Sequence, residues 1–228
     1  MNDLDKIIEL LKNKASVKQD VFVNGKSAFK EFKESAKEII DELAHEYSKI
    51  DPRVKLLFED YSEQEFRIVV GGDVLIFHMH TNVFQYDKSH YYWQQSYFKE
   101  DNSRAYGIMF RVYNFLADSL TFNRENDLGY LIARVFVNRE NHFVLESKLR
   151  LGTHYTKLNT QLFTKELQRK IILCLLNYSM EFELTVPHYM NVQTISIGEA
   201  LDFNKGIKTQ TVKRLGFKFG SDKNSDFE

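Results

Sequence analysis

Two glutamates and two histidines are the polar residues whose types and spacing best suit chemistry. They are Glu63, Glu65, His78 and His80, and they alternate with apolar residues along two neighbouring segments. Imidazole and carboxylate groups bind divalent metals, and histidine also acts as an acid or base near neutral pH. If the four side chains share one face of a sheet, they can form a metal site or an acid–base site.

A pair of glycines predicts the turn that would bring these residues together. Gly71 and Gly72 separate residues 65–70 from residues 73–86, and both segments alternate with a period of two. Glycine adopts the positive φ of a two-residue hairpin turn at little cost. The predicted register places each glutamate opposite a histidine, Glu65 with His78 and Glu63 with His80, close enough to touch. The core face then holds Phe66, Ile68, Leu75, Phe77 and Met79. The opposite face holds the two glutamates and two histidines together with Arg67, Val69, Val74 and Ile76.

A solvated sheet face explains the same hairpin pattern without any chemistry, since alternate positions of a half-exposed strand are normally polar. The His78-Met79-His80 motif is short, and no carboxylate-rich segment completes a known metal signature. A metal-dependent hydrolase or phosphoesterase, with His78 and His80 as ligands of a divalent metal, is therefore the alternative hypothesis. The hypothesis that the sequence favours, a binding or interaction protein, requires no cofactor.

Aromatic residues are concentrated between residues 91 and 98. Tyr92, Trp93 and Tyr97 combine large rings with polar edges, which can stack on a base or contact a peptide. Together with Arg67 they are the candidate ligand-binding residues. The competing interpretation is that these rings cover an open end of the sheet.

The segment from residue 204 onwards is basic and polar, which predicts a tail that follows a single domain spanning residues 1–203. Its candidate nucleic-acid contacts are Lys208, Lys213, Arg214 and Lys218. Phosphate attraction depends on charge and little on sequence. The net charge of the whole chain is only −1, however, which argues against dedicated nucleic-acid binding.

Several familiar chemistries have no support in the sequence. It contains neither of the common glycine-rich phosphate-binding motifs and no Gly-x-Ser-x-Gly elbow. The single cysteine, Cys174, falls on the apolar stripe of a predicted helix and suggests a reducing compartment. The acidic beginning of the sequence and the lack of a long apolar run favour a cytoplasmic protein with no membrane association.

Periodicity predicts an α+β fold in which an antiparallel meander of about six strands packs against two major helices. Helical spacing predicts a short helix at residues 3–14 and major helices at residues 27–49 and 164–178. Gly25 is expected to interrupt the chain before the first major helix, with Ser27 as its N-cap. The predicted strands are residues 54–58, 65–70, 73–86, 105–114, 129–137 and 142–151, with one more extended segment at residues 192–203.

The second major helix has more apolar residues than one narrow stripe requires. Ile172 and Leu176 widen its apolar face, and covering them by a second copy of the chain predicts a homodimer. The sequence thus favours a cytoplasmic binding or interaction protein that associates with itself or with another protein. The alternatives are the metal-dependent hydrolase and a nucleotide or nucleic-acid binder that uses residues 91–98 and the basic tail.

Overall fold

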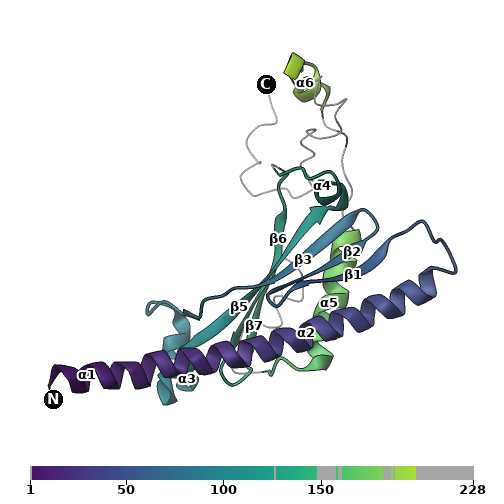
Figure 1. Ribbon diagram of the computed structural model, residues 1–228. Coiled ribbons are helices and arrows are strands. Elements are labelled where there is room, and N and C mark those ends of the chain that lie inside the picture. Colours follow the sequence, from purple (N-terminus) through teal and green to yellow (C-terminus); the bar gives the residue numbers. More distant parts are fainter. Residues whose placement is uncertain are drawn as a thin grey trace.

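The protein consists of one antiparallel sheet with its two longest helices, α2 and α5, on the same face, as described by a computed structural model (Figure 1). The structure describes residues 2–125, 127–147, 158, 161–181, 186 and 188–198. The predicted α+β class and the antiparallel meander are confirmed. The basic residues 204–228 and the end of the predicted strand at 142–151 lie outside the described residues.

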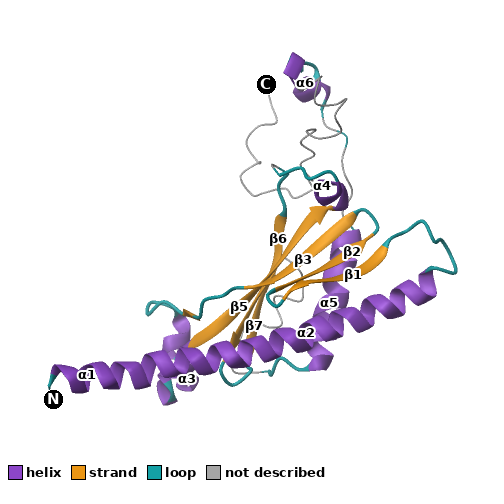
Figure 2. Cartoon of the chain, in the orientation of Figure 1, coloured by secondary structure: helices purple, strands orange, loops and turns teal. Residues whose placement is uncertain are grey.

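The sheet contains seven strands, six of which follow one another in meander order (Figure 2). The remaining strand, β4, pairs with the beginning of β5. Gly71 takes a φ of +58° in the turn between β2 and β3, as the glycine pair predicts, and Asn141 takes a φ of +62° between β6 and β7. The strands are β1 (Leu56–Ser62), β2 (Glu65–Val70), β3 (Asp73–Met79), β4 (Phe84–Gln85), β5 (Tyr106–Leu116), β6 (Tyr130–Asn138) and β7 (Phe143–Ser147).

One continuous helical rod forms the N-terminal part of the chain and runs along the sheet (Figure 1). It consists of α1 (Asp3–Leu10), one π-helical turn η1 (Leu11–Ser16) and α2 (Val17–Tyr47). The predicted break at Gly25 and the predicted cap at Ser27 are therefore wrong. A Cβ atom at position 25 would lie 2.3 Å from Cγ2 of Ile108, so glycine here permits close contact between helix and strand.

Short helices occupy the connections from β4 to β5 and from β5 to β6, and one more follows α5. The segment predicted as one long strand at residues 73–86 ends at Met79 and resumes only briefly as β4. The extended segment predicted at residues 192–203 is also wrong over its described part, because Val192 ends a helix and no strand follows up to residue 198. The short helices are η2 (Tyr91–Gln94), α3 (Ser96–Glu100), η3 (Asn102–Ala105), α4 (Ala117–Thr121) and α6 (Tyr189–Val192).

Phenylalanine rings form the centre of the main core, which lies between the sheet and the two long helices α2 and α5. Phe32 of α2 contacts the rings of Phe66, Phe77 and Phe110 on three strands, with centroid distances of 5.6 to 6.3 Å. Such tilted and offset ring pairs are favourable beyond their burial. The predicted core face of the hairpin, from Phe66 to Met79, is buried as expected.

Helix α5 (Lys165–Met180) begins at its predicted cap, where the Thr164 side chain accepts a hydrogen bond from the Leu167 amide. Ile172 is 0% exposed and Leu176 is 2% exposed within the single chain. The argument that these two residues need a second copy to cover them is therefore wrong. Helix α2 and the sheet together cover a wider face of α5 than a sheet alone could.

Candidate functional site

The hairpin register confirms one of the two predicted glutamate–histidine pairs. Glu65 on β2 is the direct cross-strand partner of His78 on β3. Both side chains lie on the outer face of the sheet, opposite the helices, because the residues on either side of them point into the core. Glu65 also accepts a hydrogen bond of 2.7 Å from Nε of Arg67, whose guanidinium stacks on the Tyr61 ring at 3.7 Å.

The other predicted pair does not form. Glu63 lies in the turn between β1 and β2 and makes a 2.8 Å ion pair with Nζ of Lys26 on the long helix. His80 lies beyond the end of β3, where its Nδ1 accepts a hydrogen bond from the Asn82 amide and its ring packs against Phe84. The predicted register fails here because Glu63 belongs to the β1–β2 turn, and the ladder between β2 and β3 begins only at Glu65. The four residues are not brought together, and no group of three or more metal-ligating side chains occurs among the described residues.

A row of charged side chains instead crosses five strands of the outer face. Each member is the cross-strand partner of the next, so the row follows directly from the ladder registers. We call it the charged row, and it consists of Glu65, His78, Arg111, Arg134 and Glu146. Sequence reasoning identified only the first two members, because the pairing of β3 with β5 and of β5 with β6 depends on connections whose lengths do not fix the register.

Arg111 is the central member of the charged row and differs from its neighbours in its contacts. Arg134 makes an ion pair with Glu146, and Glu65 makes one with Arg67. Among the described residues Arg111 has no carboxylate partner, and its Nε atom is buried without a hydrogen bond. Its guanidinium lies 5.9 Å from the centre of the Tyr113 ring. A buried donor without an acceptor is costly, so this position favours an anion.

The pKa of His78 is sensitive to the positive charge of Arg111 beside it. Burial lowers the pKa of His78, and the charge of Arg111 lowers it further, while Glu65 opposes the shift. The imidazole of His78 therefore stays neutral down to a lower pH than a free histidine does. Arg111 and Arg134 carry the positive charge at the centre of the row.

The aromatic segment covers the sheet, as the competing interpretation of residues 91–98 predicts. Tyr92 is 3% exposed and belongs to a second apolar cluster with Phe98, Phe136 and Val144 on the outer face. The Trp93 indole donates a hydrogen bond of 3.2 Å to the Tyr86 carbonyl oxygen. Burial of Tyr92 leaves little of its ring accessible for stacking on a base.

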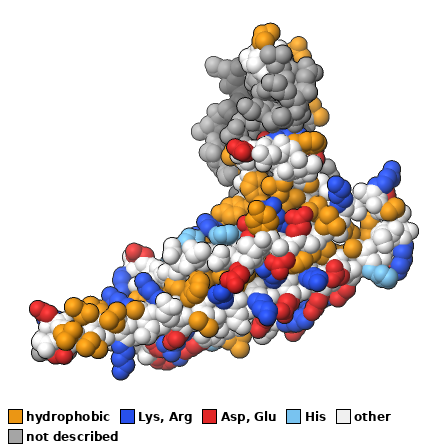
Figure 3. Space-filling model, in the orientation of Figure 1, with side chains coloured by type: hydrophobic (Ala, Val, Ile, Leu, Met, Phe, Trp, Pro, Cys, Tyr) orange, Lys and Arg blue, Asp and Glu red, His pale blue; other side chains and the backbone are white. Residues whose placement is uncertain are grey.

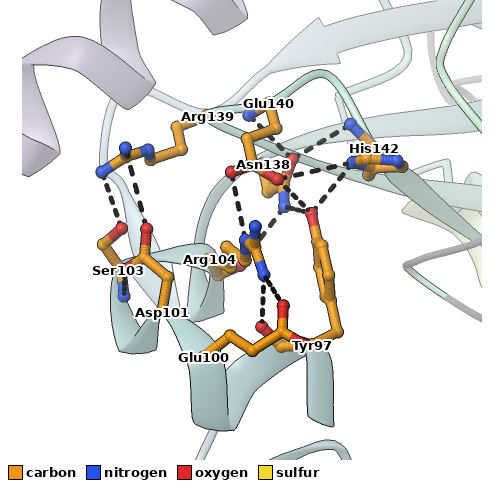
Figure 4. A network of polar contacts seen from close by, with 9 residues as sticks. All are labelled: Tyr97, Glu100, Asp101, Ser103, Arg104, Asn138, Arg139, Glu140 and His142. Carbon is orange, nitrogen blue, oxygen red and sulfur yellow. Dashed lines mark hydrogen bonds and ion pairs between the residues drawn. The ribbon is translucent and has the colours of Figure 1, made fainter. Parts of the chain in front are cut away.

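Tyr97, the remaining aromatic candidate, lies at the centre of a polar network that joins α3 to the β6–β7 hairpin (Figure 4). Its hydroxyl donates to Oε2 of Glu140 at 2.8 Å and accepts from Nδ2 of Asn138 at 2.9 Å. His142 Nδ1 lies 2.9 Å from the same oxygen. Because the hydroxyl proton is directed to Glu140, this network assigns the imidazole N–H as the donor in that contact.

The same network is closely matched in charge. Arg104 donates to Oε1 of Glu140 at 3.0 Å and to Oε2 of Glu100 at 3.0 Å, while its guanidinium stacks on the Tyr97 ring at 4.4 Å. Burial acts to raise the pKa of Glu140, but the hydrogen bonds from Tyr97 and Arg104 hold it below its usual value. Burial raises the pKa of Tyr97 to about 12. Tyr97, Arg104 and Glu140 satisfy one another, which indicates a structural role.

The other predicted features contribute no site within the described residues. The basic residues Lys208, Lys213, Arg214 and Lys218 lie outside that part of the chain. Cys174 is half-buried on α5, and burial raises the pKa of its thiol. In the described part of the chain, no helix is long and apolar enough to cross a membrane.

Comparison with known proteins gives no match of any kind, whether to a family model, to a curated protein or to a solved structure.

Proposed function

We propose that this protein is a cytoplasmic binding protein that holds an organic anion on the outer face of its sheet. The ligand would carry a carboxylate or phosphate joined to an apolar body. The observation that carries the proposal is Arg111, an arginine without a carboxylate partner among the described residues, whose Nε atom is buried and has no acceptor.

The chemistry of Arg111 suits a single anionic group. A guanidinium presents a planar fork of donors that matches the two oxygens of a carboxylate or phosphate. The two carboxylates of the charged row are already paired with Arg67 and Arg134, so they neither compete for Arg111 nor leave the face acidic. Such a charge-assisted hydrogen bond in a partly desolvated place contributes about 1.5–3 kcal/mol.

The residues around Arg111 supply the apolar part of the proposed site. Met109 and Tyr113 are its neighbours on the outer face of β5, and both are half-buried. Tyr113 is in register with Ile76 of β3 on one side and Leu131 of β6 on the other. An anionic head at Arg111 would thus have an apolar surface beside it, which favours an amphipathic ligand over inorganic phosphate.

Binding is favoured over hydrolysis because the four residues proposed for metal chemistry do not share one site. Glu65 and His78 are paired on the outer face, but Glu63 contacts the long helix and His80 lies beyond the end of β3. The one free cysteine remains the reason for proposing a reducing, cytoplasmic location.

Isothermal titration calorimetry with octanoate, octyl phosphate and octanamide tests the proposal directly. We expect saturable binding of one or both anions and no binding of the uncharged amide. The Arg111→Gln variant should lose about 10- to 100-fold in affinity, the equivalent of one charge-assisted contact. The matched control is Arg53→Gln, which removes an exposed arginine from the turn before β1.

The two anions distinguish a carboxylate ligand from a phosphate ligand. Binding of neither anion would overturn the proposal. Equal binding by the wild-type protein and the Arg111→Gln variant would also overturn it, since the site would then lie elsewhere.

A further inference from the structure

The first two turns of the N-terminal rod carry an apolar stripe that nothing in the described chain covers. Leu4, Ile7, Ile8 and Leu11 are 53% to 63% exposed, and no residue of α1 or η1 is buried. Their spacing of three and four residues places them on one side of the helix. Figure 3 shows apolar side chains gathered along this end of the rod.

The stripe lies outside the body of the protein. The first buried residue of the rod is Val21, and the helix before it extends beyond the sheet (Figure 1). The helix start is nonetheless encoded locally, because Asn2 and Asp5 form a capping box. An isolated helix this short is marginal in water, so a well-capped exposed helix with an apolar stripe favours a packing partner.

The π-helical turn η1 makes the stripe face a different side of the rod from the buried residues of α2. A π turn has one more residue than an α turn, which rotates the preceding helix by roughly 100° about its axis. Without η1, the stripe from Leu4 to Leu11 would continue in line with the buried residues of α2 such as Gly25, Phe29 and Phe32. With η1, the stripe is turned away from the surface that the sheet covers.

The charges along the rod identify what could cover the stripe. The first half is acidic, with Asp3, Asp5 and Glu9 against the single Lys6. The second half is basic, and its charged residues before Asp20 are Lys12, Lys14 and Lys18. Two such helices packed antiparallel place the acidic half of each against the basic half of the other, whereas parallel packing places like charges together.

We propose that the segment from Asp3 to Lys18 pairs antiparallel with the same segment of a second copy of this chain. A two-fold axis between Ile7 and Ile8, the middle of the stripe, places Leu4 of each copy against Leu11 of the other and Asp3 against Lys12. The interface is then self-complementary, as in most homodimers. Antiparallel pairing also places the two folded bodies at opposite ends of the helix pair, so they do not meet. The inference is independent of the proposed anion site, which lies on the outer face of the sheet.

Sedimentation equilibrium of the full chain across the micromolar range tests the association. We expect the mass to rise from that of one 27.0 kDa chain towards twice that value. The Ile7→Lys variant should shift the midpoint of this transition at least 10-fold to higher concentration. The matched control, Asn13→Lys, adds the same charge to the opposite, polar side of the same segment and should shift it little. No residue of the stripe is buried, so circular dichroism should show both variants folded.

Cysteine cross-linking tests the direction of the pairing. In a Cys174→Ser background, a mixture of the Leu4→Cys and Leu11→Cys proteins should form a mixed disulfide, because a disulfide requires the two Cα atoms to be within about 7 Å. Neither protein alone should cross-link to itself. Self-cross-linking of the Leu4→Cys protein would show a parallel pair and overturn the proposed arrangement.

Two other occupants of the stripe are distinguishable from a second copy. A mass that stays at one chain throughout the concentration range would overturn the proposal. If the monomeric protein then sedimented with vesicles of phosphatidylcholine and phosphatidylglycerol, the stripe would be assigned to a lipid surface instead.

Discussion

Tyr97 joins α3 to the β6–β7 hairpin through its hydroxyl, which contacts Asn138 and Glu140. The Tyr97→Phe variant removes the hydroxyl but keeps the ring between Arg104 and His142. We expect a loss of roughly 1–3 kcal/mol in the free energy of unfolding, because Asn138 and Glu140 are left without that partner. Urea denaturation measures this loss. Tyr61→Phe, which alters a tyrosine that is 62% exposed, is the control and should change stability by less than about 0.5 kcal/mol.

His78 gives the outer face a pH dependence of defined sign. Its pKa in the folded protein is lowered by burial and by Arg111, with a smaller contribution from His80 and opposition from Glu65. The unfolded chain therefore binds more protons than the folded one just below the usual histidine pKa of about 6.5. Stability contributed by His78 is complete above that pH and is lost as the pH falls towards the lowered value.

The His78→Gln variant should therefore lose less stability than the wild-type protein between about pH 7.5 and about pH 5. Chemical denaturation at several pH values measures the difference in slope. His45→Gln, at an exposed position near the end of the long helix, is the control and should leave the slope unchanged. A variant whose slope equals that of the wild-type protein would contradict the assignment to His78.

Among the elements, the close contact between α2 and β5 depends on Gly25, which packs against Ile108. The Gly25→Ala variant would place a methyl group 2.3 Å from Cγ2 of Ile108. Alanine favours a helix by up to about 1 kcal/mol over glycine, but forcing the helix away from the strand costs roughly 1–3 kcal/mol. We expect net destabilisation, measured as a lower midpoint in thermal denaturation.

A second glycine is a suitable control for that prediction. Gly72 has no atom within 4 Å of a built Cβ and does not require positive φ. Gly72→Ala should therefore leave the midpoint nearly unchanged. A midpoint that is unchanged or higher in the Gly25→Ala variant would show that helix propensity outweighs the contact with Ile108.

Local sequence patterns were sufficient to predict most helices and strands, but not the contacts between elements that are far apart in the sequence. The β2–β3 hairpin follows from alternation and a glycine turn, and both signals lie within the segment itself. The cap of α5 at Thr164 is equally local. The continuation of the helix through Gly25 was not predictable, because its cause is Ile108, more than eighty positions away in the sequence. The charged row escaped sequence reasoning for the same reason, since Arg111 and Arg134 join His78 only through pairings between separate hairpins.

For the whole molecule, the two proposed interaction surfaces lie on different parts of the structure. The anion site uses the outer face of the sheet around Arg111, and the self-association uses the rod before Val21. Ile172 and Leu176, the residues that first suggested a dimer, have no part in it because they are buried between α2, α5 and the sheet. Variants on one surface should therefore leave the function of the other intact.

The order of the elements also affects the chain while it is being synthesised. Six of the seven strands lie in the sheet in the order of the chain, so the sheet can form progressively as the chain leaves the ribosome. Helix α5 follows last among these elements, and only then do Ile171 and Leu175 cover their part of the inner face. A nascent chain that stalls before Thr164 would leave the part of the inner face that α5 covers exposed to solvent, which makes it a substrate for chaperones and prone to aggregate.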